Sequence, residues 1–146
     1  MTKLPEPIPG LVIRYSYLWH SEYAAGREEG QKDRPCAIVA AVRKTGQATT
    51  VLVLPVTHSP PSAGALVIEI APATEARLGL DQDRSWIELS EASRFLWPGS
   101  DIRASRTGEM STVTYGELPA RFFQAVRGAF LRANSERRTV LVPRTD

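Results

Sequence analysis

The sequence predicts a mainly β domain, a small β-barrel with one amphipathic helix near its C-terminal end. Three observations lead to this fold class. Apolar residues alternate or form short β-branched blocks in the first 90 residues, and prolines and glycines punctuate these blocks. A sustained helical spacing of apolar residues follows late, in residues 119–133. Short strands followed by a single helix are typical of a small barrel with a helical appendage.

Length and composition indicate one folded domain. The chain has 146 residues, of which 42% are hydrophobic and 23% are charged, enough to bury a core. We expect the core to span about residues 8–133, with residues 134–146 as a basic tail or an edge strand. The apolar runs are too short to cross a bilayer, and the first residues show no apolar signal core. We therefore expect a cytoplasmic protein with no membrane partner.

The first half of the chain predicts three strands and one long loop. Residues 10–19 carry apolar and aromatic side chains at every second position, which indicates a strand. Residues 20–34 are polar and lack apolar periodicity, so we expect an exposed loop. Residues 35–42 and 49–56 are β-branched runs separated by a polar turn, which predicts a hairpin of buried strands.

The second half predicts shorter elements. Residues 65–70 and 85–89 have the character of short strands, with a possible helical turn at 74–78 between them. Residues 119–133 begin with a proline suited to the first helical position and place Phe122, Val126 and Phe130 on one face. We expect this stripe to attach the helix to the barrel, with a dimer contact as the lesser alternative. Residues 139–142 are either a last strand or a loose segment.

Several chemistries have no residues to support them. Cys36 is the single cysteine, so an internal disulfide is excluded, and no second thiol or nearby histidine provides zinc-ligand spacing. We expect Cys36 to be a buried, inert thiol. The chain contains no phosphate-binding loop, dinucleotide fingerprint or nucleophile elbow. We therefore expect neither a metal nor a cofactor. The net charge of +2 is too small to indicate a nucleic-acid partner by itself.

Three short motifs occur in register along residues 8–60. Gly10 and Leu11 begin the first predicted strand, Arg34 and Pro35 follow a loop containing Glu and Gly and precede an apolar strand, and Pro55, Val56 and Thr57 end the next strand. This pattern resembles the PemK/MazF family of toxins from bacterial type II toxin–antitoxin pairs. The resemblance implies an SH3-like β-barrel, a homodimer, a cognate antitoxin, and metal-independent cleavage of single-stranded RNA.

By match to these motifs, Arg34 and Thr57 are the catalytic candidates. Metal-independent RNA cleavage passes through a crowded phosphorane that needs fixed donors, and an arginine fork can bind two phosphate oxygens. A threonine hydroxyl at a strand end can donate one more hydrogen bond. His58 follows Thr57 and can act as acid or base if the strand ends there; a solvated loop histidine is the alternative. For Arg34, the alternative is a surface ion pair with Asp33 or Glu28.

We expect the loop of residues 26–33 to form a mobile wall of the RNA groove, with Arg27, Glu28 and Lys32 as contacts. Tyr17 is the candidate for stacking on an unpaired base. Aromatic faces of strands are more often core, and this alternative applies to Tyr17 and its aromatic neighbours on the first strand, Tyr15 and Trp19, and to Trp86 and Trp97.

The chain also departs from the family pattern. Some members have an Arg-x-Asp-Gln stretch in a later strand, with the Asp as proposed base; the corresponding residues 87–91 here contain neither the Arg nor the Asp. Arg27 stands where some members have a histidine. Glu28, Glu29 or Glu91 are possible replacements for the base. The alternative function is therefore a catalytically inactive SH3-like barrel that binds RNA, DNA or a partner protein.

Overall fold

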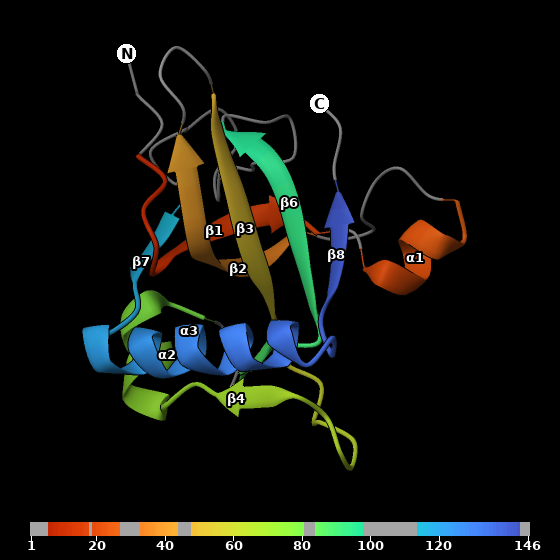
Figure 1. Ribbon diagram of the computed structural model, residues 1–146. Coiled ribbons are helices and arrows are strands. Elements are labelled where there is room, and N and C mark those ends of the chain that lie inside the picture. The colour runs from red at the N-terminus through yellow and green to blue at the C-terminus, as the bar shows by residue number, and fades with distance from the viewer. Residues whose placement is uncertain are drawn as a thin grey trace.

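The computed structural model describes residues 6–17, 19–26, 33–43, 48–80, 84–97 and 114–143. Across these residues, eight strands join in one sheet that is antiparallel except for one strand pair, and three helices accompany it (Figure 1). The elements, in chain order, are β1 (Leu11–Ser16), α1 (His20–Ala24), β2 (Asp33–Arg43), β3 (Thr49–Thr57), β4 (Val67–Glu69), α2 (Pro72–Leu78), β5 (Trp86–Glu88), β6 (Glu91–Trp97), β7 (Thr114–Glu117), α3 (Ala120–Ser135) and β8 (Val140–Pro143). The prediction of a mainly β fold is confirmed.

The sheet is curled. Its main path runs β4, β5, β3, β2, β1, β7, and β6 pairs with β3 and with β8. Although β2 and β3 separate β1 from β6 in the sheet, the ring of Tyr15 on β1 stacks on the ring of Phe95 on β6, with centroids 4.5 Å apart. This contact requires the sheet to fold over, and β1 crosses the direction of β3 in Figure 1. The result is a half-barrel with an aromatic interior.

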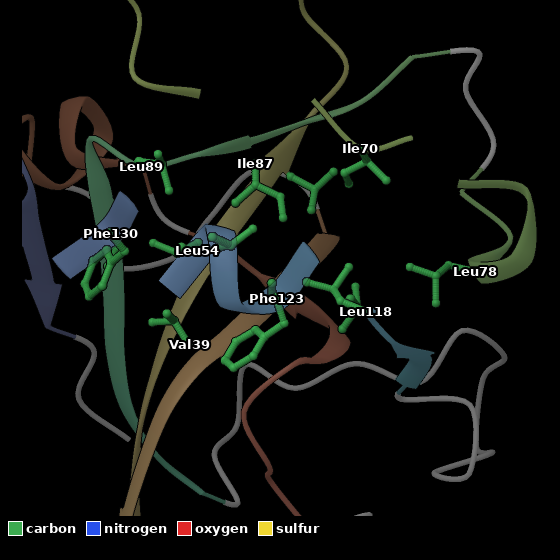
Figure 2. Packing of buried hydrophobic residues seen from close by; sticks show 14 of the residues in the cluster. Val39, Leu54, Ile70, Leu78, Ile87, Leu89, Leu118, Phe123 and Phe130 are labelled. Atoms are coloured by element: carbon green, nitrogen blue, oxygen red, sulfur yellow. The ribbon is translucent and has the colours of Figure 1, made fainter. Parts of the chain in front are cut away.

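Two apolar clusters pack on the two faces of the curled sheet. The interior cluster lies inside the curl and comprises Leu11, Ile13, Tyr15, Tyr17, Cys36, Ile38, Val51, Val53, Phe95 and Trp97. The helix-side cluster lies between the outer face, α2 and α3. Figure 2 shows its labelled members Val39, Leu54, Ile70, Leu78, Ile87, Leu89, Leu118, Phe123 and Phe130. Alternate residues of β2 and β3 join different clusters because successive side chains of a strand point to opposite faces.

The predicted hairpin and C-terminal helix are present. β2 and β3 pair antiparallel from Arg43↔Thr49 to Cys36↔Pro55, with one irregularity between Ile38 and Ala40. α3 buries the expected stripe at Phe123, Val126 and Phe130, so the stripe attaches the helix to the sheet as predicted. The helical turn at 74–78 is part of α2, and the segment left open at 139–142 is the edge strand β8, parallel to β6.

The predictions were wrong or incomplete at three places. The loop expected at 20–34 contains α1, which sits beside β8 (Figure 1), and its last two residues already belong to β2. Strands β6 and β7 were not predicted. A buried Ser93 and an exposed Arg94 and Leu96 hide the strand character of β6 in the sequence. Within the described ranges, no helix has the length and apolar character that crossing a membrane requires.

Candidate functional site

The two catalytic candidates lie at the same end of the β2–β3 hairpin. Cys36 and Pro55 form the last pair of the β2–β3 ladder, and Arg34 and Thr57 each lie two residues beyond this pair. Directly opposed residues of an antiparallel pair carry their side chains on one face. Cys36 belongs to the interior cluster, so Arg34, two residues away, lies on the same side of β2.

Arg34 is half-buried against an aromatic ring. Its guanidinium carbon lies 4.8 Å from the ring centroid of Trp19. Its Nε is buried and has no hydrogen-bond partner among the described residues. Oδ2 of Asp33 lies 3.5 Å from Nε of Arg14. Of the two partners considered for Arg34, Asp33 forms its described ion pair with Arg14, and Glu28 lies outside the described residues.

Thr57 ends β3 with a proton left to donate. Its Oγ1 accepts a hydrogen bond from the backbone N–H of Ser59 at 3.2 Å, a contact that turns the chain after the strand. A hydroxyl that accepts one bond still has its own O–H for another acceptor. On the other side of β3, Thr57 pairs with Trp86 of β5. The side chain is half-buried, so its position is restrained while the hydroxyl stays within reach of a ligand.

His58 lies just beyond the strand, which meets the condition for it to share a site with Thr57. It is exposed, and its Nδ1 lies 3.1 Å from the hydroxyl oxygen of Ser85, a fully buried residue that precedes β5. When Nδ1 donates its hydrogen to that oxygen, Nε2 carries no proton and can accept one. This contact orients the ring and leaves proton exchange to Nε2.

Tyr17 occupies the core, in line with the alternative considered for it. Its side chain is 1% exposed, and its hydroxyl donates a hydrogen bond to Glu91 Oε1 at 3.1 Å. Burial and the nearby Glu91 carboxylate raise its pKa. The ring has no free face for a base, so the structure does not place Tyr17 among RNA contacts. The other three predicted contacts, Arg27, Glu28 and Lys32, lie outside the described residues.

The remaining aromatic residues divide between core and surface. Tyr15, Trp86 and Trp97 are buried, as their core alternative predicts. Trp19 is half-buried beside Arg34 and meets the Tyr17 ring edge to face, with centroids 5.1 Å apart. Trp19 is therefore the aromatic side chain of the first strand region that reaches the candidate site.

Glu91 is the residue at this site that the sequence identified least well, since it was only one of three carboxylates considered as a base. It begins β6 and is half-buried, and its Oε1 accepts hydrogen bonds from Tyr17 Oη at 3.1 Å and from the backbone N–H of His20 at 2.9 Å. Burial raises the pKa of its carboxyl, and Glu88 adds to this, while the two donors and the His20 ring oppose it. Both donors lie more than 70 residues before Glu91, so no local pattern in the sequence marked it.

We expect the stability contribution of Glu91 to fall as the pH rises. Because burial raises its pKa above the ordinary value of 4.5, the folded protein keeps this proton at pH values where the unfolded chain has lost it. From that value upward, the free energy of unfolding decreases with pH through this group. Glu91→Gln is uncharged throughout and keeps an acceptor oxygen. Urea unfolding from about pH 4 to pH 7 should therefore show Glu91→Gln gaining stability relative to wild type.

A control for this comparison is Glu117→Gln, because Glu117 is an exposed carboxylate on β7. Its stability difference from wild type should not change with pH in this range. A difference between wild type and Glu91→Gln that stays constant with pH would contradict the assigned effect of burial.

Two further features bear on the chemistry of the site. Burial raises the pKa of the Cys36 thiol, against the lowering effect of Arg34, so this free cysteine is a poor nucleophile as expected. Among the described residues, no group of three or more His, Cys, Asp or Glu side chains gathers as a metal site.

The described part of the site offers cationic and hydroxyl donors and one histidine. Arg34 supplies a guanidinium, Thr57 an O–H, and His58 an imidazole nitrogen, all at one end of the β2–β3 hairpin. This set of groups suits a phosphate ester, because it can bind anionic oxygens and exchange a proton. Neither a protein-family model nor a curated protein matches the chain.

Proposed function

We propose that this protein is an endoribonuclease that cuts single-stranded RNA without a metal ion. In this proposal it is a PemK/MazF-type toxin with an SH3-like barrel, forms a homodimer, and is neutralised by a cognate antitoxin. The observation that carries the proposal is that Arg34 and Thr57 lie at the same end of the β2–β3 hairpin, each two residues beyond its last pair, Cys36↔Pro55. Arg34 and Thr57 are the two positions that the family resemblance assigns to catalysis.

The proposed reaction is an internal displacement at phosphorus. The ribose 2′-hydroxyl loses its proton and attacks the adjacent phosphate, the bond from phosphorus to the 5′-oxygen breaks, and that oxygen takes up a proton. The products are a 2′,3′-cyclic phosphate and a 5′-hydroxyl. Arg34 binds the phosphoryl oxygens as charge builds on them, and Thr57 donates one hydrogen bond. His58 exchanges a proton through Nε2, because Nδ1 faces Ser85.

The test is incubation of the pure protein with a long single-stranded RNA in EDTA, followed by analysis of the fragment ends. We expect discrete cuts with 5′-hydroxyl and 2′,3′-cyclic phosphate ends. A matched RNA with a 2′-deoxy nucleotide at the cut position should resist cleavage, because it lacks the attacking hydroxyl. Binding of RNA without any cutting would instead support the inactive binding module, the function favoured by the missing Arg-x-Asp at residues 87–91.

The hydroxyl of Thr57 should matter more than the size of its side chain. We expect Thr57→Ala to lower kcat by about 10²-fold, the usual effect of removing one donor to a developing oxyanion. Thr57→Ser keeps the O–H and should retain most of the activity. Thr50→Ala, at the other end of β3, is the control and should cleave like wild type. Equal rates for Thr57→Ala and wild type would remove Thr57 from the mechanism.

A further inference from the structure

One carboxylate oxygen, Oε1 of Glu91, accepts hydrogen bonds from residues on both sides of Trp19. Glu91 Oε1 accepts the hydroxyl hydrogen of Tyr17 at 3.1 Å and the backbone N–H of His20 at 2.9 Å. Tyr17 and His20 lie more than 70 positions before Glu91 in the sequence; Tyr17 follows β1, and His20 is the first residue of α1. This carboxylate therefore ties the segment 17–20 to the first residue of β6.

Trp19, inside the tied segment, is the side chain that holds the Arg34 head group. Its ring meets Tyr17 edge to face with centroids 5.1 Å apart, and the Arg34 guanidinium carbon lies 4.8 Å from its centroid. The backbone of Arg34 is set by its pairing with Tyr15 in β1. The guanidinium is several rotatable bonds away, and its Nε has no hydrogen-bond partner among the described residues. The orientation of the head group consequently depends on the Trp19 ring.

We propose that Glu91 is a positioning residue, which holds the Arg34 guanidinium in place through Tyr17, His20 and the Trp19 ring. The effect on cleavage rests on the proposed function, whereas the effect on the Arg34 side chain does not. In this proposal Glu91 transfers no proton, and its Oε1 accepts two hydrogen bonds from the protein itself. Its task is to keep the arginine fork in the orientation in which it meets the phosphate.

The first readout needs no RNA. Protons held against an aromatic ring have NMR signals displaced by the ring current, so the Arg34 Nε–H signal should be displaced in wild type. Its loss in Arg34→Lys assigns it. In Glu91→Ala we expect the signal to move toward the position of solvent-exposed arginines. Glu91→Gln retains an acceptor oxygen and should keep the signal near its wild-type position. A signal that stays in place in folded Glu91→Ala would overturn the proposal.

The second readout is RNA cleavage. A misplaced catalytic group costs up to about 10²-fold in rate, so we expect Glu91→Ala to lower kcat by roughly 10- to 100-fold with little change in KM. Glu91→Gln should restore most of kcat, and the exposed control Glu117→Ala should match wild type. If the Arg34 signal of Glu91→Ala moves to the position of solvent-exposed arginines while kcat stays unchanged, the positioning has no role in cleavage.

A further variant and the two readouts keep the outcomes distinct. Tyr17→Phe keeps the ring and removes only the hydroxyl that binds Glu91. It should also move the Arg34 signal toward the position of solvent-exposed arginines, and it provides this test if Glu91→Ala does not fold. If wild type fails to cleave RNA, the proposed function is wrong. The NMR comparison of Glu91→Ala with Glu91→Gln then still decides whether Glu91 positions Arg34.

Discussion

Arg34→Ala is expected to lower the rate of RNA cleavage by at least about 10³-fold, which is the range lost when an arginine that stabilises a transferring phosphoryl group is removed. Arg34 and Thr57 lie at the same end of the β2–β3 hairpin, and no described group accepts a hydrogen bond from Nε of Arg34. Arg34 is half-buried at the edge of the interior cluster, so truncation should leave the cluster packed. The loss should therefore appear in kcat of a folded protein.

The measurement compares cleavage rates of a defined single-stranded RNA by wild type, Arg34→Ala and Arg34→Lys, with circular dichroism as the check on folding. Arg34→Lys keeps the charge but lacks the planar fork, so it should recover only part of the activity. Arg94→Ala is the matched control, because Arg94 is an exposed arginine of β6 on the outer face of the sheet. Wild-type cleavage by folded Arg34→Ala would refute the catalytic assignment.

Phe130→Ala is expected to have the largest effect on stability. Phe130 is 4% exposed and anchors the second half of α3 in the helix-side cluster (Figure 2). Replacing a buried phenylalanine with alanine removes apolar contacts and leaves a cavity, which costs about 3–5 kcal/mol. A loss of this size is a large share of the total stability of a domain of this length. Urea unfolding followed by circular dichroism measures it.

The neighbouring Leu131 provides the control for this prediction. It lies on the same helix but is 46% exposed. Leu131→Ala should therefore change the free energy of unfolding by less than about 0.5 kcal/mol. Similar losses for both variants would mean that α3 does not pack on the sheet through the face that carries Phe130.

Local patterns were sufficient where an element buries one regular face. α3 repeats its apolar residues at helical spacing, and β2 and β3 are uninterrupted β-branched runs around a polar turn, so all three were predicted close to their observed bounds. The hairpin also brings Arg34 and Thr57 to the same end of β2 and β3, because a short turn determines the register of the strands it joins. Arg34 and Thr57 themselves were named as catalytic candidates from the resemblance to the PemK/MazF motifs, not from the hairpin.

Local patterns failed where the stabilising partner is distant in the sequence. In β6, Ser93 is buried because its hydroxyl lies 3.2 Å from the hydroxyl of Tyr15, 78 residues away, and a buried serine breaks the apolar alternation that marks a strand. The five residues of α1 lack apolar periodicity, and the Glu91 carboxylate accepts the N–H of its first residue. Neither contact produces a recognisable pattern of residues in the neighbouring sequence.

The residue pattern thus established the mainly β class, the central hairpin, the terminal helix and the two candidates at the hairpin end. It could not establish that Tyr17 turns inward to Glu91, or that Trp19 comes to lie against Arg34. These contacts exist only because the sheet curls until β1 meets β6. Spacing along the chain reports which face of an element is buried, whereas the curvature of the sheet decides which distant side chains share that buried space.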